Sequence, residues 1–186
     1  MFVARSFDVN RPGAKPEDLK GGVIGGTIIQ GSLSIGEEIE ISPGLEGRIF
    51  SKVSSLSTEK NKLEKAIAGG LIAVGTLLDP LTARNDKLRG QVAGKPGSLP
   101  EPTQHLKLKV HLIKRLLGKA ESALKVNDLI VLTVGTMTTV GNITSARNEV
   151  IEIALKNKIV IEKEQKVAIS KREEGKWRLS AYGINA

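Results

Sequence analysis

Four glycines near the start of the chain, Gly21, Gly22, Gly25 and Gly26, are the first residues whose spacing suggests chemistry. A glycine-rich loop binds phosphate when it reads GxxxxGK[ST], or when a GxGxxG sequence follows a strand and opens a helix. Neither arrangement is present, and the glycines lead into TIIQGSLSIGEEIEI, which is typical of a β-hairpin. They therefore predict a sharp turn, or a strand against which another group packs closely, rather than a phosphate loop.

The other reactive side chains do not form a catalytic or metal-binding set. The sequence has no cysteine, which excludes thiol catalysis, disulfides and zinc knuckles within it. His105 and His111 would share one face of a strand, but their spacing is too long for joint metal ligation. The hydroxyls of residues 135–139 have no His or carboxylate at triad-like spacing, and adjacent carboxylates such as Glu37 and Glu38 point apart on a strand. We predict no catalytic residue and no metal ligand.

The composition favours short strands. Aromatic residues make up only 3% of the chain, which contains 20 glycines, and its apolar residues are mostly Ile, Val, Leu and Ala. The segment AGKPGSLPEPTQ at 93–104 contains three prolines, which exclude a helix or a central strand there. We therefore predict two domains, 1–97 and 98–186.

Alternation of polar and apolar residues predicts strands in both halves. Residues 70–78 are almost continuously apolar, which predicts a strand buried on both faces, and residues 63–70 suggest one helical turn that ends at a glycine. The other predicted strands are 3–9, 22–30, 37–41, 48–56 and 87–93, then 106–113, 128–134, 141–145, 149–155, 164–170 and 177–184. In 106–113, Leu106, Leu108, Val110 and Leu112 share one face. The expected fold class is all-β, with two consecutive small β-barrels.

The charge is basic and uneven. The net charge is +8; residues 1–98 carry 13 Lys and Arg against 11 Asp and Glu, and residues 99–186 carry 15 against 9. This balance fits an RNA-facing surface, and it fits equally a basic protein with dispersed lysines. No apolar run approaches the roughly 18 residues of a membrane span, and the N-terminus does not read as a signal peptide. We expect a cytoplasmic protein that does not bind a membrane.

Basic residues gather in two segments of the second half. Lys114, Arg115 and Lys119 lie in one, and Lys171 and Arg172 lie in the other, close in sequence to the only tryptophan, Trp177. Cations contact phosphates and a tryptophan can stack on a base, so these segments are candidates for facing RNA or the ribosome. For Trp177 itself we favour a buried core position, because the chain is poor in aromatic residues.

Several motifs together resemble a known family. The segment VGTLLDPLTARNDKLRGQVAGKPGSLPE, residues 74–101, resembles the second barrel of translational GTPases leading into the third. Its LDPLTARNDKLRGQV portion is similar to the gamma subunit of archaeal and eukaryotic translation initiation factor 2. The segments RSFDVNRPGAKPEDLKGGVIGGTIIQG, LIKRLLG, LKVNDLIVLTVGTMTTVG and SKREEGKWRLSAYGI match that family in order and spacing. The resemblance covers essentially the whole chain.

The resemblance implies a function. The family's subunit is similar to elongation factor Tu, with a GTPase domain followed by two barrels, domains II and III. With GTP it binds methionylated initiator tRNA and brings it to the small ribosomal subunit. It also assembles with an alpha subunit through domain II and a beta subunit through the GTPase domain. The chain contains no GxxxxGK[ST] and no DxxG followed by NKxD. We therefore expect the GTPase domain, with its GTP and Mg²⁺, to be missing, and this chain to be neither an enzyme nor a cofactor-binding protein.

The resemblance to elongation factor Tu also implies a site on the glycine-rich strand. The terminal adenosine of the tRNA would lie over bare backbone and a flat apolar side chain, with cations nearby for phosphates. The residues implied are Arg5, Lys20, Gly22, Val23, Ile24, Gly75 and Thr76. Tight packing at a barrel corner is an equally good explanation of the glycines.

Three alternatives stay open. The first is the matching barrels of a selenocysteine-specific elongation factor, against which the LDPxLT and WRL segments argue. The second is a stand-alone RNA-binding β-barrel protein. The third is a stand-alone GTPase, which nucleotide binding measured by calorimetry would reveal.

Overall fold

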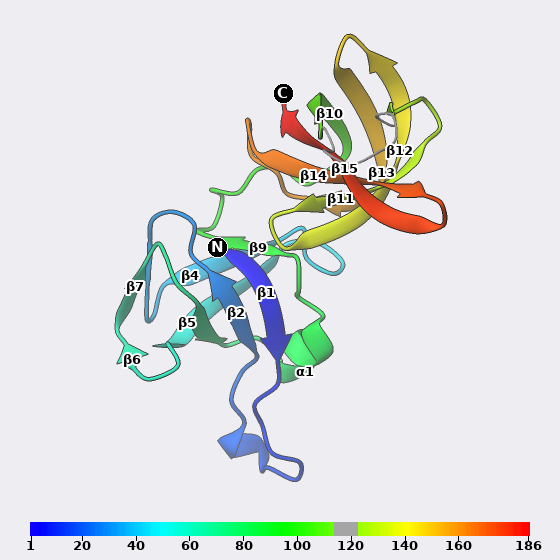
Figure 1. The fold of residues 1–186 in the computed structure, drawn as a ribbon. Helices are drawn as coiled ribbons and strands as arrows, with labels where there is room; N and C mark the ends of the chain where they lie inside the picture. Colours follow the sequence, from blue (N-terminus) through cyan, green and yellow to red (C-terminus); the bar gives the residue numbers. More distant parts are fainter. Residues whose placement is uncertain (114–122) are drawn as a thin grey trace. The chain divides into compact units, whose positions relative to one another are not determined.

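The computed structural model describes residues 1–113 and 123–186. These residues form two compact units, Met1–Leu99 and Pro100–Ala186, so the division falls two residues after the boundary expected from the prolines. We call them barrel 1 and barrel 2, because in each of them a β-sheet closes on itself (Figure 1). The prediction of an all-β fold with two consecutive small barrels is confirmed.

Six antiparallel strands close barrel 1 in the order β4-β9-β1-β2-β8-β5, and β5 pairs back with β4. They are β1 (Phe2–Phe7), β2 (Val23–Thr27), β4 (Glu38–Ser42), β5 (Ile49–Ser57), β8 (Ile72–Thr76) and β9 (Val92–Gly94). Alternation turns one side of each strand inward. The fully buried core side chains include Val3, Ile24, Ile41, Val74 and Leu88.

Smaller elements surround this ring. Strand β6 (Lys62–Leu63) pairs with β5, while β3 (Ser32–Ser34) and β7 (Lys65–Ile67) form a separate two-stranded ribbon. Three short helices are η1 (Pro16–Asp18), α1 (Pro80–Ala83) and η2 (Arg84–Asp86). Helix α1 begins where the Asp79 carboxylate accepts a hydrogen bond from the Leu81 amide at 2.8 Å and a proline occupies the first helical position.

Barrel 2 is more regular, with strands of 6 to 11 residues. Its closed order is β10-β13-β12-β11-β14-β15, and β15 pairs with β10. The strands are β10 (Thr103–Leu112), β11 (Leu129–Val134), β12 (Met137–Arg147), β13 (Val150–Ile159), β14 (Lys166–Glu173) and β15 (Lys176–Asn185). Inward-facing Ile, Leu and Val side chains such as Leu108, Ile130, Leu132, Ile143 and Ile169 fill the interior.

Three local predictions were wrong. Residues 63–70 form no helical turn, because β7 buries Ala66 and exposes its neighbours with the period of a strand. The run 70–78 is a strand only over β8, and Leu71 and Leu77 are 76% and 66% exposed. Residues 87–93 form strand only from Val92, after the turns around Asp86. Leu112 lies on the same face as Leu106, as predicted, and pairs with the buried Ala181, although at the end of β10 it is 39% exposed.

Candidate nucleic-acid interface

The predicted tRNA site falls on three neighbouring strands of barrel 1, with β2 between β1 and β8. Arg5 pairs with Gly25, and Phe7 pairs with Val23, which in turn pairs with Gly75. Residues paired directly across antiparallel strands project to the same side of a sheet. These positions therefore share the outer side of the barrel, and the intervening positions face the core.

The seven predicted residues separate into two groups by burial. Arg5 and Lys20 are exposed, and Val23 is half-buried on the outer side. Ile24 and Thr76 are completely buried, so their side chains belong to the interior of barrel 1. Gly22 and Gly75 are also buried. Six of the seven residues, all except Lys20, thus lie on β1, β2 and β8 or at their ends. Of these six, only Arg5 and Val23 are accessible to solvent.

Gly22 and Thr76 form a tight contact at the corner of barrel 1. The Thr76 hydroxyl donates a hydrogen bond to the Gly22 carbonyl at 2.6 Å and accepts one from the Leu78 amide at 3.2 Å. A Cβ at Gly22 would lie 2.6 Å from the Ala83 Cβ of α1, and one at Gly75 would lie 2.3 Å from the Ser55 hydroxyl. Close packing therefore accounts for both glycines without any ligand.

Gly25 differs from these glycines because a Cβ there would make only ordinary van der Waals contacts. A Cβ there would have Arg5 Cβ as its nearest neighbour, at 3.8 Å, and Phe7 Cε1 at 4.0 Å. The backbone of β2 is thus accessible between an exposed cation and an exposed aromatic ring. We call Arg5, Phe7, Val23 and Gly25 the glycine shelf. Sequence reasoning missed Phe7 and Gly25, although the strand alternation after Arg5 places Phe7 on the same face.

Asp86 holds the cation of the glycine shelf in position. Its carboxylate accepts hydrogen bonds from Arg5 Nε at 2.9 and 3.0 Å and from the Ser6 amide at 2.9 Å. The Arg5 hydrogen bond, followed by that of the Ser6 amide, lowers the pKa of Asp86 below its usual value. The Arg5 side chain is still 67% exposed. The ion pair fixes the guanidinium and leaves it available to solvent.

Lys20 lies apart from the glycine shelf, just after η1 in the connection between β1 and β2. The side chain of Asn10 accepts a hydrogen bond from the Lys20 amide and donates one to its carbonyl, both at 2.7 Å. This pair of contacts fastens the base of the connection, where it returns to the barrel. The exposed Lys20 side chain takes no part in it.

The predicted basic residues of barrel 2 have different surroundings. Lys171 forms an ion pair with Asp128 at 2.7 Å and donates to the Ala123 carbonyl at 3.1 Å. Arg172 is exposed and faces Trp177 across the β14–β15 pair. The prediction that Trp177 is buried was wrong, since it is 46% exposed near the β14–β15 turn. Lys114, Arg115 and Lys119 lie outside the described residues.

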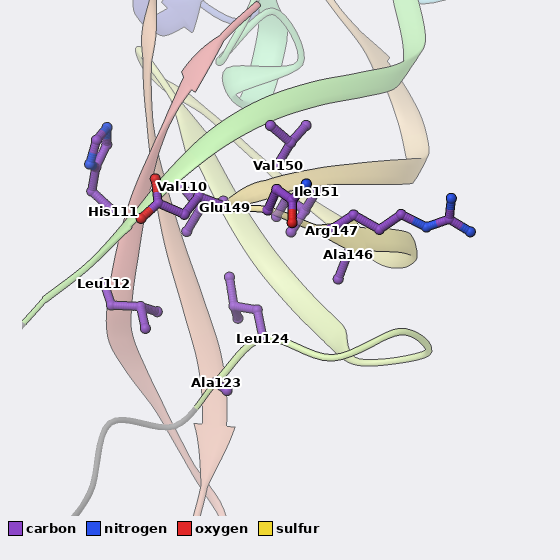
Figure 2. A pocket seen from close by; sticks show the side chains of 11 residues that line it. Val110, His111, Leu112, Ala123, Leu124, Ala146, Arg147, Glu149, Val150 and Ile151 are labelled. Atoms are coloured by element: carbon purple, nitrogen blue, oxygen red, sulfur yellow. The ribbon is translucent and has the colours of Figure 1, made fainter.

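A pocket of about 480 Å³ opens in barrel 2, at the β12–β13 hairpin (Figure 2). Its lining is mainly apolar, including Val110, Leu124 and Ile151, with Arg147 and Glu149 as its charged residues. It contains none of the predicted site residues. Within residues 1–113 and 123–186, no three His, Asp or Glu side chains gather closely enough to hold a metal ion, and no helix could span a membrane.

Comparisons with known proteins identify close relatives. Residues 104–185 match the family described as "Initiation factor eIF2 gamma, C terminal". Proteins named translation initiation factor 2 subunit gamma are similar along 99% of the chain: that of Methanopyrus kandleri is 47% identical, that of Methanococcus maripaludis 46% and that of Aeropyrum pernix 42%. The chain spans about half of each relative, 48% of its length.

A solved structure has the same fold at lower sequence identity. The bacterial selenocysteine-specific elongation factor EF-Sec matches 98% of this chain with a TM-score of 0.73 and 23% identity, over 27% of its own chain. A likeness at this identity extends to the fold alone. The alternative of a selenocysteine-specific factor is therefore less well supported than the resemblance recognised in the sequence. Residues 104–185 thus belong to the eIF2 gamma C-terminal family, and nearly the whole chain is similar to translation initiation factor 2 gamma subunits.

Proposed function

We propose that this chain is the two-barrel part of an initiation factor 2 gamma subunit, and that its glycine shelf receives the aminoacylated 3′ end of initiator tRNA. The whole subunit would carry methionylated initiator tRNA, with GTP, to the small ribosomal subunit. The GTP, its Mg²⁺ and the beta subunit would be bound by a GTPase domain outside these residues. The sequence similarity to named gamma subunits supports this assignment.

The half-buried backbone of Gly25, beside the exposed Arg5 and Phe7, is the observation that carries the proposal for the 3′ end. Unpaired nucleotides are recognised by stacking on flat side chains and by contacts to their phosphates. Phe7, which is 37% exposed, supplies the ring, and the bare backbone of Gly25 permits close approach. Arg5 uses Nε for Asp86, and its guanidinium has further N–H groups for a phosphate. The buried members of the predicted set would support the shelf from beneath.

An acceptor-stem RNA that carries methionine and ends in a free 3′ strand tests the site. We expect Gly25→Val to weaken its binding about tenfold, because the new side chain would cover the backbone between Arg5 and Phe7, while a β-branched residue suits a strand. Arg5→Gln should also weaken it, and Lys62→Gln, which removes an exposed cation on β6, should not. Equal binding by Gly25→Val and the unmodified chain would exclude the shelf.

A second surface of barrel 1 suits the alpha subunit. Four isoleucine and leucine side chains around the β3–β7 ribbon are exposed by 48% to 76%: Ile29, Ile35, Ile67 and Leu71. A soluble surface rarely keeps neighbouring large apolar side chains in water unless another protein covers them. We place the alpha subunit's docking site on this ribbon.

Binding of the alpha subunit's C-terminal domain tests this placement. Ile67→Lys, at the most protruding position of β7, should abolish association while the barrel still folds, because the side chain is 69% exposed. Leu77→Lys changes a similarly exposed residue, at the end of β8, and serves as the matched control. Association that survives Ile67→Lys but is lost in Leu77→Lys would move the docking site to the other end of the sheet.

A further inference from the structure

An apolar stripe runs along the outside of barrel 2 on strand β15. Trp177, Leu179 and Tyr182 are 46%, 50% and 39% exposed, and Ile184 continues the same face. The register between β14 and β15 shifts by one residue between Leu179 and Ala181. Because of this shift, Tyr182 projects to the same outer side of the barrel as Trp177 and Leu179. From Trp177 to Tyr182 the stripe extends over roughly 15 Å of strand.

Two rings on neighbouring strands already stack within this stripe. His111 of β10 lies opposite Tyr182, and their ring centroids are 4.9 Å apart with an interplanar angle of 23°. Since the neighbouring Val110 is buried in the core, alternation places His111 on the outer side of β10, at the edge of the pocket in Figure 2. A stacked pair of flat rings on a sheet is a surface on which another flat ring can lie.

Cations border the stripe on both sides. Ile184 pairs with Lys109 on β10 and with Lys166 on β14, and Trp177 pairs with Arg172. Strands β10, β14 and β15 together contain seven Lys and Arg but a single carboxylate, Glu173, which faces Lys176 at the end of the hairpin. Lys171 is the one cation of these strands that pairs with a described aspartate.

This arrangement matches single-stranded nucleic acid better than other partners. Its phosphates carry the charge that the bordering cations complement, and its unpaired bases have apolar faces for the central rings. A duplex offers phosphates but keeps its bases stacked inside, so the rings would contribute nothing. We propose that the β10–β15–β14 face of barrel 2 binds single-stranded RNA, with a base on the His111–Tyr182 pair and phosphates at Lys109 and Lys166.

The proposal is independent of the glycine shelf, which lies on barrel 1. Its test is binding of a fluorescent ten-nucleotide oligouridylate to the intact chain, measured by anisotropy at several salt concentrations. Tyr182→Leu should weaken binding about tenfold, and Tyr182→Phe, which keeps a ring, should restore it. Lys109→Gln and Lys166→Gln should each lower the slope of log affinity against log salt by about 0.7, whereas Lys62→Gln on barrel 1 should leave it unchanged.

The only tryptophan of the chain gives a second readout. Its emission should change when the oligonucleotide binds, because Trp177 lies on the proposed face. Circular dichroism confirms that Tyr182→Leu is folded. Duplex RNA binding as tightly as the single strand, with no effect of Tyr182→Leu, would overturn the proposal. A second result would also overturn it: polyglutamate displaces the oligonucleotide, and Tyr182→Leu and Tyr182→Phe bind the oligonucleotide as tightly as the unmodified chain. That result would indicate an acidic protein surface as the partner.

Discussion

The two barrels have the same number of strands in the closed sheet but differ in what fills them. Barrel 1 buries five polar or charged side chains, Ser6, Glu40, Ser42, Thr76 and Gln91. The described part of barrel 2 buries two, Thr139 and Ser180. At Gly21 and Gly26 of barrel 1, a neighbouring backbone lies in the space that a Cβ would occupy. At the buried glycines of barrel 2, Gly141 and Gly183, that space is taken mainly by Leu and Ile side chains.

The two barrels are therefore stabilised in different ways: barrel 2 by apolar side chains, and barrel 1 also by buried hydrogen bonds and close backbone packing. A core of interchangeable apolar side chains tolerates exchange between residues of similar volume. A core that depends on individual hydrogen bonds and on missing side chains does not tolerate such changes, because each lost partner leaves a buried polar group unsatisfied. Substitutions in barrel 1 should therefore be more damaging than similar ones in barrel 2.

Gly26→Ala should give the largest effect. A Cβ at this position would lie 1.9 Å from the Phe2 carbonyl oxygen, so β1 and β2 would have to separate. We expect a loss of more than about 3 kcal/mol in the free energy of unfolding, measured by chemical denaturation. Gly25→Ala is the matched control on the same strand, and its nearest contact of 3.8 Å predicts a change below about 0.5 kcal/mol. Similar losses in the two variants would refute the close-packing explanation.

Glu40→Gln should come second. Glu40 is completely buried, its Oε1 lies 3.0 Å from Arg48 Nη1, and its Oε2 accepts a hydrogen bond from the Gly97 amide at 2.7 Å. The Arg48 contact is close enough for an ion pair, but its alignment is not that of a hydrogen bond. Because Arg48 is partly exposed, we expect a loss of about 2 kcal/mol rather than the larger cost of a fully buried pair. Glu38→Gln, exposed on the same strand, should be nearly neutral.

Thr76→Val should cost about 1–2 kcal/mol, since it keeps the shape of the side chain but removes the donor to the Gly22 carbonyl. The comparison between barrels becomes direct if Thr138→Val is measured beside it. Thr138 is exposed on β12, and its hydroxyl meets that of Thr133 at 3.4 Å, so its loss should change stability by less than about 0.5 kcal/mol. Equal costs would mean that the buried hydroxyl of barrel 1 has no special role.

The smallest effect is expected in barrel 2, at Asp128. Burial raises the pKa of this carboxyl, but hydrogen bonds from Lys171 Nζ and the Lys125 amide outweigh it, so the pKa is lowered overall. A lowered pKa adds stability above the ordinary value near 3.9, and this stability disappears as the pH falls through the pKa of the folded state. Asp128→Asn should therefore cost less than about 1 kcal/mol at neutral pH and nothing at strongly acidic pH. A difference that persists at acidic pH would contradict this explanation.

The two barrels also differed in how far the sequence predicted them. Alternation along β10 and β13 identified the strands of barrel 2, because long strands bury every second residue. The short strands of barrel 1 carry too few residues to show a period, so β7 was mistaken for a helical turn. Motif spacing identified the family, but it could not distinguish Gly22, where a Cβ would collide with α1, from Gly25, where a Cβ would make only ordinary contacts. Trp177 was misplaced because scarcity of aromatic residues does not determine which face one occupies.

The contact between the first and last strands of barrel 1 constrains the order in which the chain can fold. Phe2 pairs with Val92, the Val3 amide donates to the Gln91 carbonyl at 3.0 Å, and the Arg5 side chain meets Asp86. One edge of β1 therefore has no partner until the ribosome has released about ninety further residues. An unpaired strand edge exposed for that long is prone to pairing with other chains. Barrel 1 should thus be the part of the molecule that most needs protection during its own synthesis.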